Sequence, residues 1–179
     1  MKIKFLLMGL IGMLALPAVA QEDALKDFPG YVDFGELNNM FGEPNVQIAI
    51  GGSLLGLISV LTAHEDPEVA KLFKRLHGVR ISVFENPTVN EGAVDFVKSI
   101  SSKLSQQGWE SVVTVNSDDE QVRIFMKFNG ENVEGITVMA LAEDEAVFVN
   151  VIGDLNPDEL GKVMDNFDIE IGDSDDDEA

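Results

Sequence analysis

Apolar residues alternate with polar or small residues in six segments of the chain, which is the pattern of half-buried β-strands. The six segments are 46–50, 79–84, 109–115, 122–128, 133–141 and 146–152. Other segments carry apolar residues at helical spacing. The predicted helices cover 53–64, 67–77, 90–107 and 156–167. Strands and helices of ordinary length in this proportion predict an α+β domain.

Local signals fix several of these boundaries. Asp66-Pro67 and Asn156-Pro157 each combine an N-cap residue with proline at the first helical position, which is a favoured way to begin a helix. Ala93, Val97, Ile100 and Leu104 recur on one face of the helix predicted at 90–107. Asn129-Gly130 is a strong hairpin signal, because both residues tolerate the positive φ of a tight turn.

The element order is β-α-β-α, followed by a β-meander and a C-terminal helix. Since the first two strands are joined through helical structure, we expect them to lie parallel with a right-handed crossover, and the last four strands to be antiparallel. The sequence therefore predicts a single mixed β-sheet with helices packed mainly on one face.

The two ends of the chain differ from this domain. Residues 1–20 carry two lysines in the first four positions, continue with an apolar run and end in Ala18-Val19-Ala20, which is the layout of a cleaved secretory signal. We expect cleavage after Ala20 and a periplasmic or secreted mature protein. Residues 21–44 are predicted as an extended N-terminal arm, 45–168 as the α+β domain and 169–179 as an acidic disordered tail.

Charge and cysteine content narrow the function classes. Without the signal the chain keeps ten of its twelve Lys and Arg and all 32 acidic residues, for a net charge of −22. Such a surface disfavours binding to nucleic acid or anionic lipid, because both depend on neutralising phosphates. The chain has no cysteine, which excludes disulfides, thiolate metal sites and cysteine nucleophiles. After cleavage no remaining apolar stretch approaches the length of a transmembrane helix.

Several short motifs resemble a family of small exported bacterial domains of unknown function. The resemblance rests on the segments 28–33 (FPGYVD), 48–55 (IAIGGSLL), 79–85 (VRISVFE), Trp109 and 149–155 (VNVIGDL). It covers most of the mature chain and implies a shared fold, but no catalytic residue. Many members of the family look like lipoproteins, whereas this chain has Gln21 where the lipid-bearing cysteine would be needed.

Candidate chemistry is sparse. Gly51-Gly52-Ser53 invites comparison with a phosphate-binding loop, but the spacing and the missing lysine favour a tight strand-to-helix turn. His64 and His77 lack companions at metal-ligand spacing, and the acidic clusters at 116–120, 143–145 and 173–178 do not match a calcium loop. The sequence therefore assigns no catalytic residue, no cofactor and no metal ligand.

The helix predicted at 53–64 is apolar on nearly all sides, which predicts burial on two sides. The alternative is that one side is exposed and offers a docking surface. The candidate surface consists of Leu54, Leu57, Ile58 and Leu61. We expect an exported non-catalytic module that binds an envelope protein or a small apolar ligand. The alternatives are a hydrolase that uses carboxylates and a structural or assembly protein.

Overall fold

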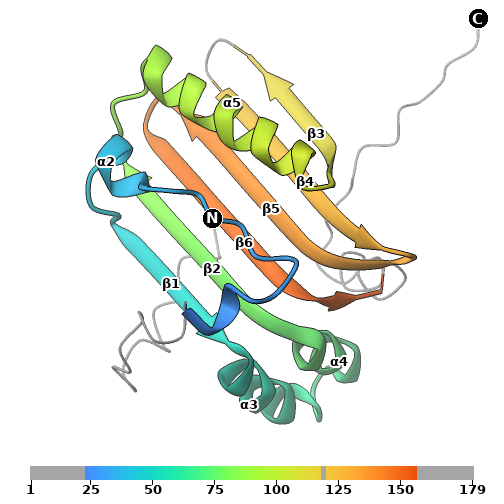
Figure 1. Ribbon diagram of the computed structural model, residues 1–179. Helices are drawn as coiled ribbons and strands as arrows, with labels where there is room; N and C mark the ends of the chain where they lie inside the picture. The colour runs from blue at the N-terminus through green and yellow to red at the C-terminus, as the bar shows by residue number, and fades with distance from the viewer. Residues whose placement is uncertain (1–22, 118–119, 157–179) are drawn as a thin grey trace, which may run out of the picture.

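The computed structural model describes residues 23–117 and 120–156, which form one six-stranded sheet with helices against it (Figure 1). The helices are α2 (Leu37–Phe41), α3 (Gly52–Thr62), α4 (Pro67–Arg75) and α5 (Glu91–Gln106). The strands are β1 (Val46–Gly51), β2 (Leu76–Glu85), β3 (Trp109–Asn116), β4 (Glu120–Asn129), β5 (Asn132–Ala142) and β6 (Glu145–Leu155). The α+β class with a single sheet is confirmed.

The sheet has the order β1-β2-β6-β5-β4-β3, and every neighbouring pair is antiparallel. The prediction of a mixed sheet with parallel β1 and β2 is therefore wrong. The reason is that the two helices between these strands form a hairpin and not a crossover. α3 leads away from the end of β1 and α4 returns to the same end, so β2 starts beside Gly51 and runs back along β1.

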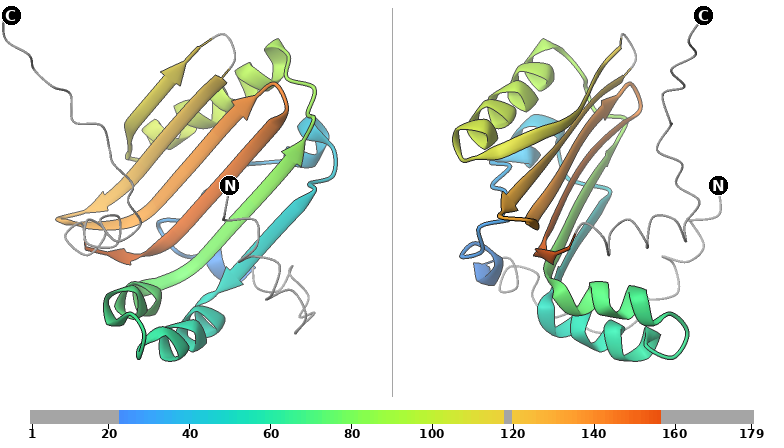
Figure 2. Two further views of the ribbon diagram at one scale, coloured as in Figure 1. Left: turned by 180° about the vertical axis from the view of Figure 1, so that it is seen from behind. Right: turned by 90° about the vertical axis from the view of Figure 1, so that its right-hand side faces the viewer.

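Helix α5 covers one face of the sheet. Its predicted apolar side is confirmed, because Ala93, Val97, Ile100 and Leu104 are all buried. They pack in the main core with large side chains from the strands, among them Phe84, Phe125, Met139, Leu141 and Phe148. Figure 2 shows α5 and α2 on the same side of the sheet. We call this side the covered face.

An N-terminal segment, residues 28–36, crosses the covered face beside α2 (Figure 1). Asn150, fully buried in β6, holds it: its Oδ1 accepts from the backbone N–H of Val32 at 2.9 Å, and its Nδ2 donates to the carbonyl of Gly30 at 2.9 Å. Arg80 adds a hydrogen bond of 2.8 Å to the Val32 carbonyl. The segment approaches the sheet so closely that a Cβ on Gly30 would overlap the backbone of Glu134.

Helices α3 and α4 form a hairpin beyond one end of the sheet and extend toward the side opposite α5 (Figure 2). A second core cluster lies there, built around Leu55, Leu76, Val133 and Leu155. The helices are thus divided between one face and one end, which differs from the expected packing mainly on one face. The signal at 1–20, the helix predicted at 156–167 and the tail at 169–179 lie outside the described residues, apart from Asn156.

Candidate binding surface

Helix α3 exposes one apolar side to solvent. Leu57, Val60 and Leu61 have exposed fractions of 52%, 69% and 68%. Leu54 and Ile58 lie half-buried on the flanks of this side. Burial of α3 on two sides is therefore wrong: of the four candidate residues, Leu57 and Leu61 are exposed and the other two only partly so. Val60, the most exposed, was missed, although its spacing from Leu57 places both on one helical face.

The opposite side of α3 anchors it. Leu55 is buried in the second core cluster, and the hydroxyl of Ser59 donates to the carbonyl of Ala70 in α4 at 2.7 Å. Helix α4 begins as predicted, with Asp66 accepting hydrogen bonds from the N–H groups of Glu68 and Val69 at 3.1 and 3.0 Å. These contacts fix the hairpin, so the exposed side chains of α3 stand on a rigid support.

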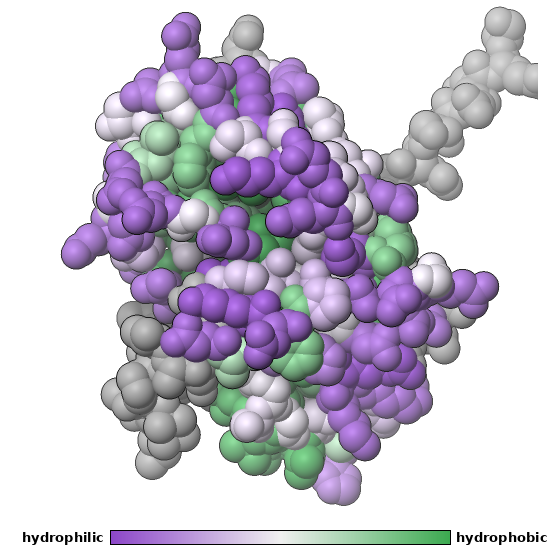
Figure 3. All heavy atoms as spheres, viewed as in Figure 1, coloured by the Kyte–Doolittle hydropathy of each residue, from purple (hydrophilic) through white to green (hydrophobic). Residues whose placement is uncertain are grey.

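The hairpin has a different charge from the rest of the chain. Between Gly52 and Gly78 three acidic residues balance three basic ones. The basic residues are Lys71, Lys74 and Arg75, and the Nζ of Lys71 lies 2.7 Å from a carboxylate oxygen of Glu68. Figure 3 shows green, hydrophobic residues at the lower end of the molecule, where α3 lies, with purple, hydrophilic residues beside them toward α4. The hairpin thus forms a lobe without net charge on an acidic protein, and its apolar surface is that of α3.

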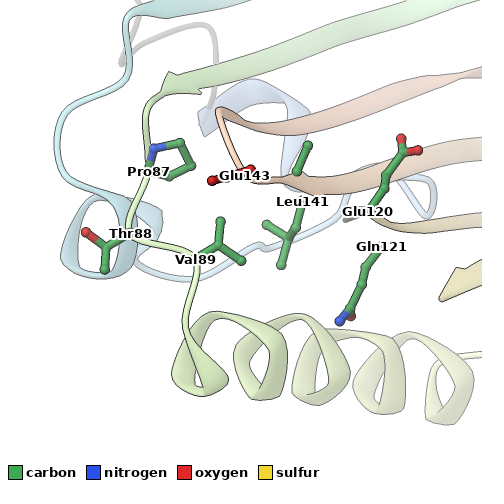
Figure 4. A pocket seen from close by; sticks show the side chains of 8 residues that line it. Pro87, Thr88, Val89, Glu120, Gln121, Leu141 and Glu143 are labelled. Atoms are coloured by element: carbon green, nitrogen blue, oxygen red, sulfur yellow. The ribbon is translucent and has the colours of Figure 1, made fainter. Parts of the chain in front are cut away.

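Three clefts in the described residues are lined by both polar and apolar residues, and none of them includes Leu57, Val60 or Leu61. One, with a volume of about 460 Å³, lies between the loop before α5 and the ends of β4 and β5 (Figure 4). Buried Leu141 forms part of its wall. Glu120 and Glu143 also line it, and both are exposed to solvent. A general acid is usually held in a desolvated site, and this pair is not.

Two smaller clefts of about 260 and 300 Å³ share Phe28 and His77 among their lining residues. The two rings stack at 4.4 Å between centroids, so His77 is half-buried against the N-terminal segment. The glycine-rich turn borders one of these clefts at Ser53. There Gly52 packs against the backbone of His77, where a Cβ would lie 3.4 Å from the carbonyl oxygen. This is the tight strand-to-helix turn that the sequence favoured.

The acidic clusters form no metal centre in the part of the chain that the structure describes. Within it, no three His, Cys, Asp or Glu side chains gather as metal ligands would. Residues 143–145 are exposed at the turn between β5 and β6, and 118–119 and 173–178 lie outside the described residues. None of the helices described is long and apolar enough to cross a membrane.

The described residues form an antiparallel α+β domain, with the α3–α4 hairpin beyond one end of the sheet. A sequence model of the domain of unknown function DUF4252 matches residues 39–163. The chain therefore belongs to this family, and the predicted resemblance to a domain of unknown function is confirmed. No curated protein matches the chain.

Proposed function

We propose that the mature chain is a non-catalytic module that works outside the cytoplasm and binds another protein through the exposed side of α3. The observation that carries this proposal is the group of three large aliphatic side chains, Leu57, Val60 and Leu61, each more than half exposed on a helix whose other side is buried. Contiguous exposed apolar side chains of this kind commonly mark interaction sites. The signal-like residues 1–20 support export.

The shape of the surface favours a protein over a small apolar ligand. Small ligands bind in concave sites that bury most of their surface. Leu57, Val60 and Leu61 instead lie on the outside of a helix, and none of the three lines the clefts of 260, 300 and 460 Å³. A protein with its own apolar face can cover Leu57, Val60 and Leu61 together. The neutral charge of the hairpin avoids the repulsion that the remaining acidic surface would impose.

Site-specific photo-crosslinking tests this proposal. Because the chain lacks cysteine, the substitution Leu57→Cys in the mature chain creates a single position for a thiol-reactive photo-crosslinker. Val112→Cys is the matched control, since Val112 is also an aliphatic residue with an exposed fraction of 51% but lies in β3, away from the hairpin. Both labelled proteins are irradiated in an envelope preparation from the producing cell. We expect a discrete crosslinked product from position 57 and not from position 112.

Competition shows whether the product depends on α3. Excess unlabelled mature chain should suppress the product at position 57, whereas the double variant Leu57→Gln/Leu61→Gln should not. The variant must first show an unaltered circular dichroism spectrum. Equal products at positions 57 and 112, or equal suppression by the variant, would contradict docking through α3.

A further inference from the structure

The sheet face opposite α5 is lined by aliphatic side chains along its full width. Because side chains alternate along a strand and the strands are in register, this face consists of rows that cross the sheet. The first row is Val46, Val83, Val147, Ala140, Val122 and Val115. The second row is Ile48, Ile81, Val149, Val138, Ile124 and Val113. The third row is Ile50, Val79, Val151, Ile136 and Met126. We call this surface the aliphatic face.

Only one end of the aliphatic face is covered by a core cluster of the described residues. The third row packs against the cluster around Leu55 and Leu76, next to the α3–α4 hairpin. The first and second rows belong to neither core cluster of the part that the structure describes. At the edges Val46, Val113 and Val115 are exposed.

The aliphatic face is larger and more uniformly apolar than a sheet face that meets water usually is. Six strands about 4.8 Å apart give each row a length of roughly 24 Å. An antiparallel sheet that faces water on one side normally alternates apolar and polar residues, with the polar residues outward. Here both faces are apolar, which is the pattern of a sheet packed on both sides.

We propose that the chain's own C-terminal segment, residues 156–167, packs on the aliphatic face as an amphipathic helix, over the third row and up to the second. Its sequence begins with the cap Asn156-Pro157, which favours a helix start. Leu160, Val163, Met164 and Phe167 then follow at spacings of three, one and three residues. On a helix these four residues form one stripe, with the charged residues of the segment outside it. Such a stripe is the complement that an aliphatic sheet face requires.

The position of the segment in the chain supports this placement. It follows Leu155, the last residue of β6, and β6 is the third of six strands, under the middle of the face. Leu155 belongs to the cluster that covers the third row, so the chain leaves the sheet at the covered end. Twelve residues of helix span about 18 Å. Measured back along β6 from Leu155, Val151 lies about 14 Å away, Val149 about 20 Å and Val147 about 27 Å. A helix running back along β6 therefore crosses the third row and comes up to the second, but does not reach the first.

Charge favours this segment over a second copy of the chain as the occupant. Two mature chains of net charge −22 repel each other, whereas a segment joined directly to β6 meets the face at an effective concentration of about millimolar or more. Docking through α3 and coverage of the aliphatic face involve different residues, so the two can be tested separately.

Hydrogen exchange of the mature chain, from Gln21 onward, tests the proposal directly. We expect the amides of residues 160–167 to exchange at least about tenfold more slowly than in the free peptide of the same sequence. The protection should not change on dilution of the protein. Exchange as fast as in the free peptide would overturn the proposal. Protection that falls on dilution would also overturn it and would assign the face to a second copy.

Two single substitutions in the full mature chain then locate the contact. Val163→Asp places a charge in the apolar stripe and should abolish the protection and increase binding of a hydrophobic dye. Lys162→Asp is the matched control, because it introduces the same residue on the opposite side of the helix, and it should keep the protection. The fluorescence of Trp109, buried in the covered face, reports whether each variant keeps its fold. Equal loss of protection in both folded variants, or in neither, would overturn the proposal.

Discussion

Asn150 is the residue whose substitution should reveal how the N-terminal segment is held. Its side chain is fully buried, accepts from Val32 N–H at 2.9 Å and donates to Gly30 O at 2.9 Å and Ile136 O at 3.3 Å. Asn150→Val keeps a residue that suits a strand and removes all three hydrogen bonds. Thr137→Val is the matched control, because Thr137 lies opposite Asn150 in the register and makes one side-chain hydrogen bond, to Val149 O at 2.8 Å.

The magnitude follows from the groups that lose their partners. Asn150→Val leaves the N–H of Val32 and the carbonyl of Gly30 without the amide that bound them. A buried polar group left without a partner costs about 1–3 kcal/mol, so the two together cost about 2–6 kcal/mol. The loss cannot exceed the cost of detaching the segment from the sheet, because the detached polar groups bind water. Detachment exposes Val32 and Phe34, at about 1.5–3 kcal/mol each. We expect Asn150→Val to lower the free energy of unfolding by about 2–5 kcal/mol and Thr137→Val to lower it by about 1 kcal/mol.

Urea denaturation of the mature chain, followed by the fluorescence of Trp109, measures both values. Limited proteolysis near Val32 and Phe34 shows whether the segment is released, and Asn150→Val should speed this cleavage while Thr137→Val should not. The reasoning is refuted if the two variants lose stability equally, or if Asn150→Val is within about 0.5 kcal/mol of the unmodified chain.

The remaining predictions concern α3, two glycines and the N-terminus. Leu55→Ala should lower the free energy of unfolding by about 2–5 kcal/mol and Leu57→Ala by less than about 1 kcal/mol, because the first leucine is buried and the second is exposed; equal losses in urea denaturation would contradict the assigned burial. Gly30→Ala should release the N-terminal segment, since its Cβ would overlap the backbone of Glu134. Gly56→Ala meets open space and should stabilise α3 by up to about 1 kcal/mol. Proteolysis tests the release of the segment, and thermal denaturation tests the gain in stability. The intact mass of the protein recovered outside the cytoplasm should place its N-terminus at Gln21, and a retained segment before Gln21 would refute cleavage after Ala20.

The alternation of apolar and polar residues was enough to locate all six strands, and helical spacing located α3, α4 and α5. Strong local signals carried these predictions, such as the Asp66-Pro67 cap and the four apolar residues on one side of α5. The direction of β1 relative to β2 could not be predicted from such local signals. It depends on α3 and α4 forming a hairpin, which is set by tertiary contacts such as that of Ser59 with Ala70.

The candidate surface was predicted only in part for a related reason. An apolar helix looks the same in sequence whether its second side is buried or exposed, so Leu57 and Leu61 could be proposed but their exposure could not. Asn150 did carry a signal that was missed. Asn150 is two residues from both Phe148 and Ile152, so its side chain lies on the same side of β6, which faces the core. A polar residue in that position needs hydrogen-bond partners.

The strand order has a consequence for the time at which the protein can fold. β2 pairs with β6, although the whole of α5, β3, β4 and β5 lies between them in the chain. The first third of the domain therefore cannot join the sheet until the last strand has been synthesised. Pairing of such distant segments is slow, because loop closure must precede the contacts that reward it. Late closure keeps the chain open during synthesis, as the proposed export before folding would require.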